Sequence, residues 1–275
     1  MGSVIPLKKE IDNSYLRLKN LVGGKLDDVS QRIKYKLASE INLIHKMTDY
    51  HVKSGGKRIR PLLTLASAKL CGYKNGNRDV NLAACIELIH NATLLHDDVI
   101  DNSNLRRGIK TANSLWGNQS SILVGDYLFS RCFEMMVEDG SQEILKLLSS
   151  TSSRIAQGEV LQLEHRGEVD LLEETYFNII SMKTAALFAA ATKVGACLGE
   201  RSKKEKDALE SYGKNLGLAF QISDDSFDYF SSKTVFGKEI GKDFYEGKTT
   251  LPLIIIFQRA NSEERNFLKE IFKKK

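Results

Sequence analysis

The chain has 275 residues, of which 42% are hydrophobic and 27% charged, and its net charge at pH 7 is +5. These proportions are typical of a soluble globular protein, and the small numbers of proline (3) and glycine (20) argue against a β-sandwich or a linker-rich array. A mild basic excess is compatible with a nucleic acid, an anionic membrane surface or a phosphorylated substrate.

Apolar residues recur at spacings of three and four along almost the whole chain, which predicts helices throughout. In chain order, helices are expected over residues 5–22, 25–53, 61–70, 79–101, 111–116, 119–138, 141–165, 172–199, 202–230, 249–259 and 262–274. The 79–101 segment is apolar nearly all round, as is typical of the central helix of a large bundle. No alternating strand pattern or internal domain boundary is evident, so the sequence predicts an all-α fold with one helical domain over residues 1–275.

The cysteines indicate a reducing compartment. Cys71, Cys85, Cys132 and Cys197 form no Cys-x-x-Cys pair, and all but Cys71 lie in apolar helical stretches, so we expect small core residues without disulfides. The N-terminus has no apolar signal core, and no run of 18 or more apolar residues occurs. We therefore expect a cytoplasmic protein.

Two acidic clusters with the same spacing end long apolar helices. The first contains Asp97, Asp98 and Asp101, and the second contains Asp224, Asp225 and Asp228. On a helix this spacing directs the first and last carboxylates of a cluster the same way. Carboxylates at the end of a buried helix are costly without cations, and oxygen ligands of this kind suit Mg²⁺. An exposed acidic helix end is the alternative for either cluster alone, and their repetition favours the metal.

A polar stripe continues from each cluster into its helix, through His90 and Thr93 in one case and Gln221 in the other. These stripes predict a cavity that both helices line. Basic residues that could bind an anion there are Lys57 and Arg60 at a helix start, Arg106 and Arg107 after the first cluster, Lys183 within a helix, and Lys238 and Lys248 after the second cluster. No Walker loop or Gly-x-Gly-x-x-Gly motif supports a nucleotide.

These motifs resemble those of the trans-type polyprenyl diphosphate synthases. The matching segments are Gly-Gly-Lys-Arg-Ile-Arg-Pro at 55–61, Leu-Leu-His-Asp-Asp-Val-Ile-Asp at 94–101, Arg106-Arg107-Gly108, Gly125-Asp126, Gln157-Gly158-Glu159, Lys183-Thr184-Ala185, Phe220-Gln221 with Asp224-Asp225-x-x-Asp228, and Asp243-x-x-Glu246-Gly247-Lys248-x-Thr250-Leu251-Pro252. They follow the family's order from about residue 50 to residue 255. Residues 91–96 are most similar to those of the octaprenyl, nonaprenyl and decaprenyl enzymes that make quinone side chains.

The resemblance implies a helical bundle of the isoprenoid synthase type, a transferase activity and a homodimer. The substrates would be isopentenyl diphosphate and an allylic diphosphate such as farnesyl diphosphate, with about three Mg²⁺ ions, no nucleic acid, and a product that can partition into a membrane. The implied metal ligands are Asp97, Asp98, Asp101, Asp224, Asp225 and Asp228. The implied allylic diphosphate contacts are Arg106, Lys183, Thr184, Gln221, Lys238 and Lys248, and those for isopentenyl diphosphate are Lys57, Arg60, His90 and Arg107.

Product length would depend on the depth of the cavity along the first acidic helix. Ala92 and Thr93 are small where short-chain members of the family carry aromatic residues. Phe133 and Met136 are candidates for the cavity floor, with ordinary core packing as the alternative. The sequence departs from the family at two places. Ser226-Phe227 replaces the aliphatic pair that is common inside the second cluster, and Lys242 stands where an acidic residue is frequent. Family members also usually continue beyond the Thr-Leu-Pro helix, so we expect their usual C-terminal helices to be absent.

The alternatives are a synthase of shorter farnesyl or geranylgeranyl products, a non-catalytic subunit of a heteromeric synthase, a terpene cyclase and a nucleic-acid binder. A non-catalytic subunit should lack aspartates that are all present here. A cyclase typically lacks the second cluster and the site at Lys57 and Arg60. A nucleic-acid binder should gather its basic residues on one exposed face without interleaved carboxylates.

Overall fold

The computed structural model describes residues 7–53, 55–230 and 241–273. The helices are α1 Leu7–Val22, α2 Lys25–Lys36, α3 Asn42–Lys53, α4 Ile59–Leu70, α5 Arg78–Ile100, α6 Ala112–Trp116, α7 Asn118–Asp139, α8 Gln142–Glu164, α9 Glu173–Ile180, the π-turn η1 Ser181–Ala185, α10 Ala186–Leu198, α11 Lys203–Phe230, α13 Lys242–Tyr245, α14 Leu251–Arg259 and α15 Ser262–Lys273. The prediction of an all-α fold is confirmed.

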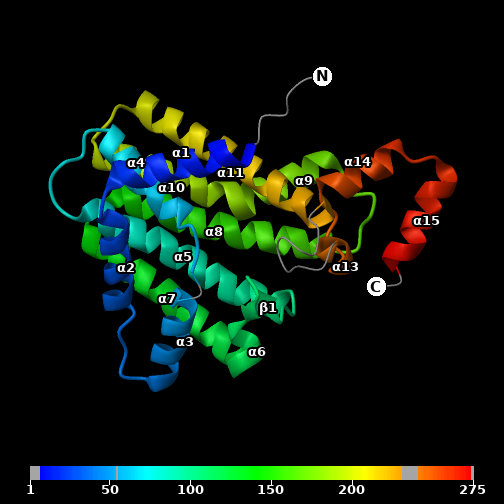
Figure 1. Cartoon of the computed structure of the whole chain (residues 1–275), viewed down its shortest axis with the longest axis horizontal. Coiled ribbons are helices and arrows are strands. Elements are labelled where there is room, and N and C mark those ends of the chain that lie inside the picture. Colours follow the sequence, from blue (N-terminus) through cyan, green and yellow to red (C-terminus); the bar gives the residue numbers. More distant parts are fainter. Residues whose placement is uncertain (1–6, 54, 231–240, 274–275) are drawn as a thin grey trace.

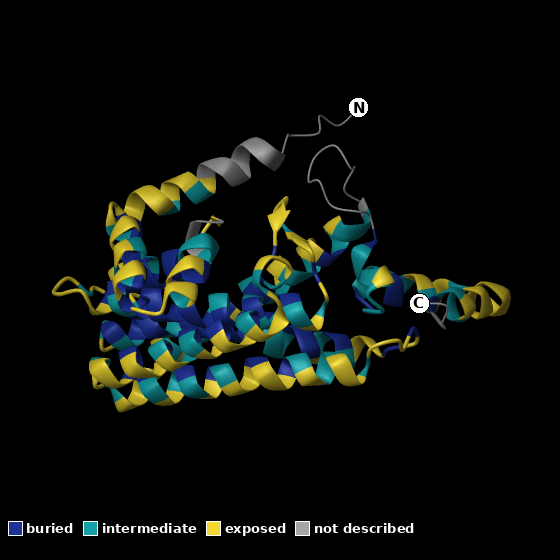
Figure 2. Cartoon of the chain, turned by 90° about the horizontal axis from the view of Figure 1, so that it is seen from below, coloured by how far each residue is buried: buried dark blue, intermediate teal, exposed yellow. Residues whose placement is uncertain are grey.

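Helix α5 lies at the centre of the bundle, as its apolar sequence predicts. It packs against α2, α4, α7 and α10, and its side chains from Leu82 to Cys85 and at Leu88 and Ile89 are almost completely buried. Figure 1 shows α5, α8, α10 and α11 running along the long axis of the molecule, and Figure 2 shows buried residues gathered in the middle of the bundle. The carboxyl ends of α5, α8 and α11 therefore lie at one end of the bundle.

The segment Glu173–Leu198 is one long helical run that is apolar enough to cross a membrane by length and composition alone. In the most apolar 18-residue window of this run, 72% is buried inside the protein. The run is therefore a core helix of the bundle. Its π-turn was not predicted.

Two local features differ from the expectations. The predicted 25–53 helix is two helices, because the chain leaves the helical conformation between Lys36 and Asn42. Within the described residues, an antiparallel pair of two-residue strands, β1 Leu105–Arg106 and β2 Ile109–Lys110, turns the chain back after α5. Helix α4 begins at Ile59, so Pro61 lies in its first turn as predicted, where a backbone N–H would have no helical acceptor.

The last helices form a separate arm. Figures 1 and 2 both show α14 and α15 projecting from the end of the bundle that holds the carboxyl end of α5. Val169, Leu253 and Phe272 make a small apolar cluster of their own, against which Phe244 and Phe257 pack. Helix α14 is joined to the bundle by its packing against α9 and α11, whereas Phe272 of α15 packs against Val169 in the connection that precedes α9.

Candidate active site

The first acidic cluster lies at the carboxyl end of α5, as predicted. Asp98 is buried, and its Oδ1 accepts hydrogen bonds from Arg106 at 2.9 and 2.8 Å. The Asp101 carboxylate pairs with Lys248 at 2.7 Å, although the two residues are 147 positions apart. Burial raises the pKa of Asp97 to about 6, and the nearby Glu159 and Asp101 carboxylates add to this while Lys183 opposes it.

The second cluster ends α11 and is connected to the π-turn by a chain of hydrogen bonds. Thr184 donates to Gln221 at 2.7 Å, Gln221 donates to Asp225 at 2.7 Å, and Tyr176 donates to the other Asp225 oxygen at 2.6 Å. Asp225 is buried, and each of its carboxylate oxygens accepts a hydrogen bond from a protein side chain, whereas Asp224 is exposed. Burial raises the pKa of Asp225 to about 6, which the two hydrogen bonds partly offset.

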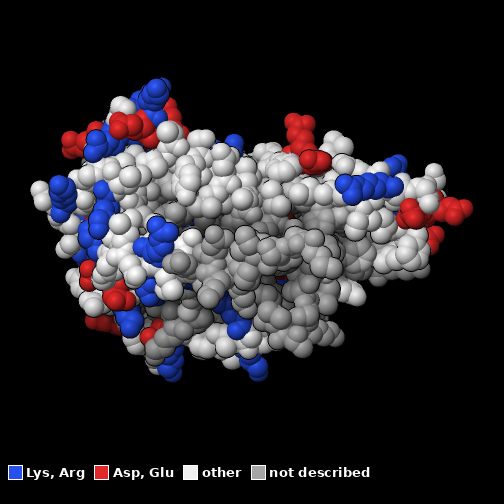
Figure 3. Space-filling view, turned by 45° about the horizontal axis from the view of Figure 1, so that its top comes forward, with Lys and Arg blue, Asp and Glu red and all other residues white. Residues whose placement is uncertain are grey.

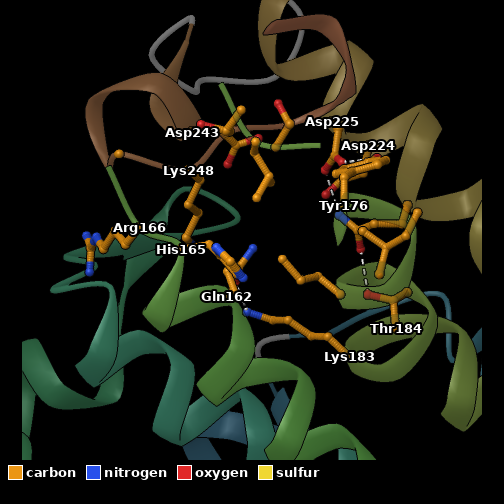
Figure 4. A pocket seen from close by; sticks show the side chains of 17 residues that line it. Gln162, His165, Arg166, Tyr176, Lys183, Thr184, Asp224, Asp225, Asp243 and Lys248 are labelled. Atoms are coloured by element: carbon orange, nitrogen blue, oxygen red, sulfur yellow. Dashed lines mark hydrogen bonds between the residues drawn. The ribbon is translucent and has the colours of Figure 1, made fainter. Parts of the chain in front are cut away.

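A cavity of about 170 Å³ lies between the second cluster, the π-turn and residues 243–250. Figure 4 shows Tyr176, Asp224 and Asp225 on one side, Asp243 and Lys248 on the other, and Lys183 reaching in from the π-turn. Lys183 pairs with Glu159 and donates to Gln162 at 2.8 Å. Two of the cations predicted to hold a diphosphate, Lys183 and Lys248, thus line the same cavity.

The π-turn that carries Lys183 and Thr184 depends on a glycine in α8. A Cβ atom at Gly158 would lie 2.7 Å from the backbone nitrogen of Lys183 and 2.8 Å from Met182. Only a residue without a side chain allows α8 to approach this closely. Single π-turns within α-helices occur frequently at functional sites.

Residues 241–250, here called the α13 segment, lie across the end of the two acidic helices. Asp228 accepts a hydrogen bond from the backbone nitrogen of Asp243 at 3.0 Å, and Glu246 pairs with both Lys242 and Lys248 at 3.0 and 2.9 Å. Burial raises the pKa of Asp243 to about 7, and the Asp228 and Asp225 carboxylates raise it further. Lys238 lies outside the described residues.

A second group of cations lies beside this site, near the start of α4. The Arg60 guanidinium lies 4.6 Å from the centre of the Phe188 ring, and burial lowers its pKa to about 10. Burial and the neighbouring Arg60 hold the pKa of His90 well below its usual value. Arg107 packs against Gly56, and a Cβ atom at Gly56 would lie 2.8 Å from the Arg107 guanidinium. This contact places the neighbouring Lys57, which is exposed, close to Arg107. Within the described residues, buried Arg60 Nε has no hydrogen-bond partner, as expected of a group that awaits an anion.

Several residues at the site were not predicted to act there. They are His51, Glu159, Gln162, Tyr176, Asp243 and Glu246. Asp243 and Glu246 could have been found, because their Asp-x-x-Glu-Gly-Lys run directly follows the second cluster. Glu159 lies in the Gln157-Gly158-Glu159 segment that matches the family, but its pairing with Lys183 could not be read from the sequence. Tyr176 gave no signal, since only folding brings it to Asp225.

The predicted chain-length residues differ in position. Ala92 and Met136 are buried in the core, and Thr93 donates to the His90 carbonyl at 2.7 Å. Phe133 is 46% exposed on the outer face of α7, which differs from the interior position predicted for a cavity floor. Cys132 and Met136 occupy the inner face instead.

The donor set fits a divalent cation that a diphosphate brings with it. Among residues 7–53, 55–230 and 241–273, no three His, Cys, Asp or Glu side chains converge closely enough to hold a metal alone. Mg²⁺ usually takes one or two carboxylates and completes its shell with water and phosphate oxygens. Burial and neighbouring carboxylates raise the pKa values of Asp97 and Asp243, and a bound cation would offset both effects.

The face of the molecule in Figure 3 is not uniformly basic. On the face in Figure 3, lysines and arginines gather at one end of the molecule and are interspersed with carboxylates.

Comparison with known proteins places these features in a family. The sequence model described as Polyprenyl synthetase matches residues 41–275. The chain is 42% identical to the octaprenyl diphosphate synthase of Escherichia coli over 92% of this chain and 78% of that protein. It is 40% identical to a short chain isoprenyl diphosphate synthase of Methanothermobacter thermautotrophicus, over 82% of this chain and 70% of that one.

A crystal structure of a polyprenyl synthase from Caulobacter crescentus, complexed with calcium and isoprenyl diphosphate, matches with a TM-score of 0.90 and 43% identity. The match covers 94% of this chain and 79% of that one. The chain therefore belongs to the polyprenyl synthetase family of prenyltransferase enzymes.

Proposed function

We propose that the chain is a Mg²⁺-dependent synthase that condenses isopentenyl diphosphate with an allylic diphosphate, such as farnesyl diphosphate, in the trans sense. One observation carries this proposal: Lys183, Lys248 and the second acidic cluster line one cavity at the end of the bundle, and the ion pair of Lys248 with Asp101 joins the first cluster to it. A non-catalytic subunit is disfavoured, because the carboxylates and their partners are all in place.

The residues divide between the two substrates. Arg106, Lys183, Thr184, Gln221 and Lys248 would bind the allylic diphosphate, and Lys57, Arg60, His90 and Arg107 would bind isopentenyl diphosphate. Asp97, Asp101 and exposed Asp224 are the best placed to reach metal ions, of which we expect about three, whereas Asp225 would orient its neighbours through Tyr176 and Gln221. When bound, Mg²⁺ neutralises the charge on the departing diphosphate.

The arrangement of these side chains supports the following order of bond breaking and bond formation. The allylic C–O bond breaks while Lys183, Lys248 and Arg106 stabilise the negative charge that develops on the diphosphate. The alkene of isopentenyl diphosphate forms the new C–C bond, and the product carbocation loses a proton to the departed diphosphate. Water would capture the carbocation, and Leu171, Ile179 and Ile180, the apolar part of a mainly polar lining, would help to exclude it.

We further propose a long-chain product, used for quinone side chains. The support is Ala92, which is small and completely buried one turn below the first cluster, with Ala84 and Cys85 further along the same helix. About five helical turns separate Asp97 from the start of α5 at Arg78, and one turn corresponds to roughly one isoprene unit. A shorter product is the second candidate, since relatives of both kinds are about equally similar.

The test is to give the purified chain farnesyl diphosphate, labelled isopentenyl diphosphate and Mg²⁺, and to measure product length by chromatography after dephosphorylation. We expect labelled products of about eight units or longer. Products of three or four units would support the shorter-chain alternative, and no product under any condition would reject the enzyme.

The Ala92→Phe variant tests the path of the tail. A phenyl ring one turn below Asp97 should block that path and shorten the product by several units. An unchanged product length would show that the tail takes another route through the protein.

We also propose that the protein works in the cytoplasm as a homodimer. Leu123, Phe133 and Val137 are 67%, 46% and 66% exposed, and their spacing places them on one outer face of α7. Exposed apolar stripes of this kind mark protein interfaces. Light scattering after gel filtration should show a dimer, and Leu123→Asp combined with Val137→Asp should yield monomers; a monomeric parent chain would contradict the proposal.

A further inference from the structure

Five side chains form a continuous polar chain at the mouth of the site. Lys242 donates to the Ser103 hydroxyl at 3.0 Å and pairs with one oxygen of Glu246 at 3.0 Å. The other Glu246 oxygen pairs with Lys248 at 2.9 Å, and Lys248 pairs with Asp101 at 2.7 Å. The chain therefore begins and ends just after α5, and its middle belongs to the α13 segment.

The α13 segment is built onto the second acidic cluster. The backbone nitrogen of Gly241 donates to the Asp228 carbonyl at 2.9 Å, and that of Asp243 donates to the Asp228 carboxylate at 3.0 Å. Any displacement of the segment would therefore move Asp228 and Asp243. The same segment is held from its other side, where the backbone nitrogen of Gly167 donates to the Gly247 carbonyl at 2.9 Å.

Lys248 and Lys242 join this segment to the first cluster in different ways. The contact of Lys248 is with Asp101, and both of these groups are needed at the metal–diphosphate complex in the proposed reaction. The contact of Lys242 is with Ser103, which is buried and has no place among the substrate or metal ligands. The Lys242 contact can persist when Asp101 and Lys248 turn to the substrate.

We infer that Lys242 is a positioning residue: through Ser103 and Glu246 it holds the α13 segment, and with it Lys248, against the end of α5 during substrate binding. This inference rests on the proposed function. Glu246 is 12% exposed in its side chain and accepts from both lysines, so it connects the position of Lys248 to that of Lys242. Loss of either end of the Ser103–Lys242 contact would let the segment, and Lys248 with it, move away from the end of α5.

The test compares Lys242→Gln and Ser103→Ala with the double variant and with Lys242→Arg in the full chain. We expect roughly five- to tenfold higher KM for farnesyl diphosphate in Lys242→Gln and Ser103→Ala, because one charge-assisted hydrogen bond is lost, with kcat changed less than about twofold. The double variant should be no worse than Lys242→Gln, and Lys242→Arg should restore most of the affinity. The control is Lys269→Gln, whose lysine pairs with Asp170 at 3.0 Å on the α15 arm.

A second measurement does not depend on turnover. In the substrate-free protein, Lys242→Gln should speed amide hydrogen exchange at residues 241–250, and Lys269→Gln should leave it unchanged there. If the parent chain makes no product, the proposed function fails while this measurement still tests the contact. Unchanged exchange in Lys242→Gln, an unchanged KM, or fully additive effects in the double variant would each overturn the inference.

Discussion

At the scale of single residues, the site is a set of partly buried charges that pair with one another in the substrate-free protein. Arg106 is paired with Asp98, Lys183 with Glu159, and Lys248 with Asp101. Each cation is therefore in position but occupied by a carboxylate. Substrate and metal would exchange these partners, so binding does not require new cations to be brought from solution.

His51 gives a pH-dependent test at this scale. Burial, with Arg106 and Arg107 nearby, lowers its pKa to about 4. Because the folded pKa lies below the unfolded one, the neutral imidazole favours folding above about pH 6.5, and this stability is lost as pH falls toward 4. By pH 5 the loss is about 2 kcal/mol in the free energy of unfolding.

Denaturant titrations of the parent chain and His51→Asn between pH 7.5 and pH 5 isolate this contribution, since the other titrating groups are common to both. The variant should become more stable relative to the parent as pH falls. A difference that stays constant with pH would show that His51 is readily protonated in the folded protein.

At the scale of elements, the close contact of α8 with the π-turn fixes Lys183. Gly158→Ala would place a methyl group 2.7 Å from the Lys183 nitrogen, so backbone must shift. We expect kcat to fall roughly ten- to a hundredfold, as when a catalytic group is displaced by a fraction of an ångström or more. Gly24→Ala is the matched control, because Gly24 has a helical φ of −70° and open space around its Cβ position. Equal activity in both variants would contradict a positioning contact.

At the scale of the whole molecule, the described chain contains one large apolar core and two smaller clusters near the site. Phe272 belongs to the smallest cluster, on the α15 arm. Phe272→Ala should free the arm locally, at a cost of about 3 kcal/mol, while the main bundle keeps its unfolding midpoint. Hydrogen exchange should rise in α15 and remain slow in α5; Phe267→Ala, at a residue 63% exposed, is the control. Faster exchange in α5 would show that arm and bundle unfold together.

Much of the fold and part of the site could be predicted from the sequence. The acidic clusters end α5 and α11 as expected, because helical periodicity and a run of carboxylates are local signals. The β1–β2 pair was missed because two-residue strands show no alternation. The π-turn depends on Gly158 in another helix, and the ion pair of Lys248 with Asp101 depends on the packing of distant segments. Phe133 was placed inward because periodicity alone does not say which side of α7 meets the core.

The π-turn also determines where the protein can tolerate the deletion of a single residue. One π-turn accommodates one additional residue, so the faces of α9 and α10 are offset by about 100° from those of an uninterrupted α-helix. Tyr176 before the turn and Phe188 after it meet Asp225 and Arg60 only with this offset. A one-codon deletion within residues 181–185 would rotate one helical half against the other, whereas the exposed connection at residues 74–77 should accept the same deletion.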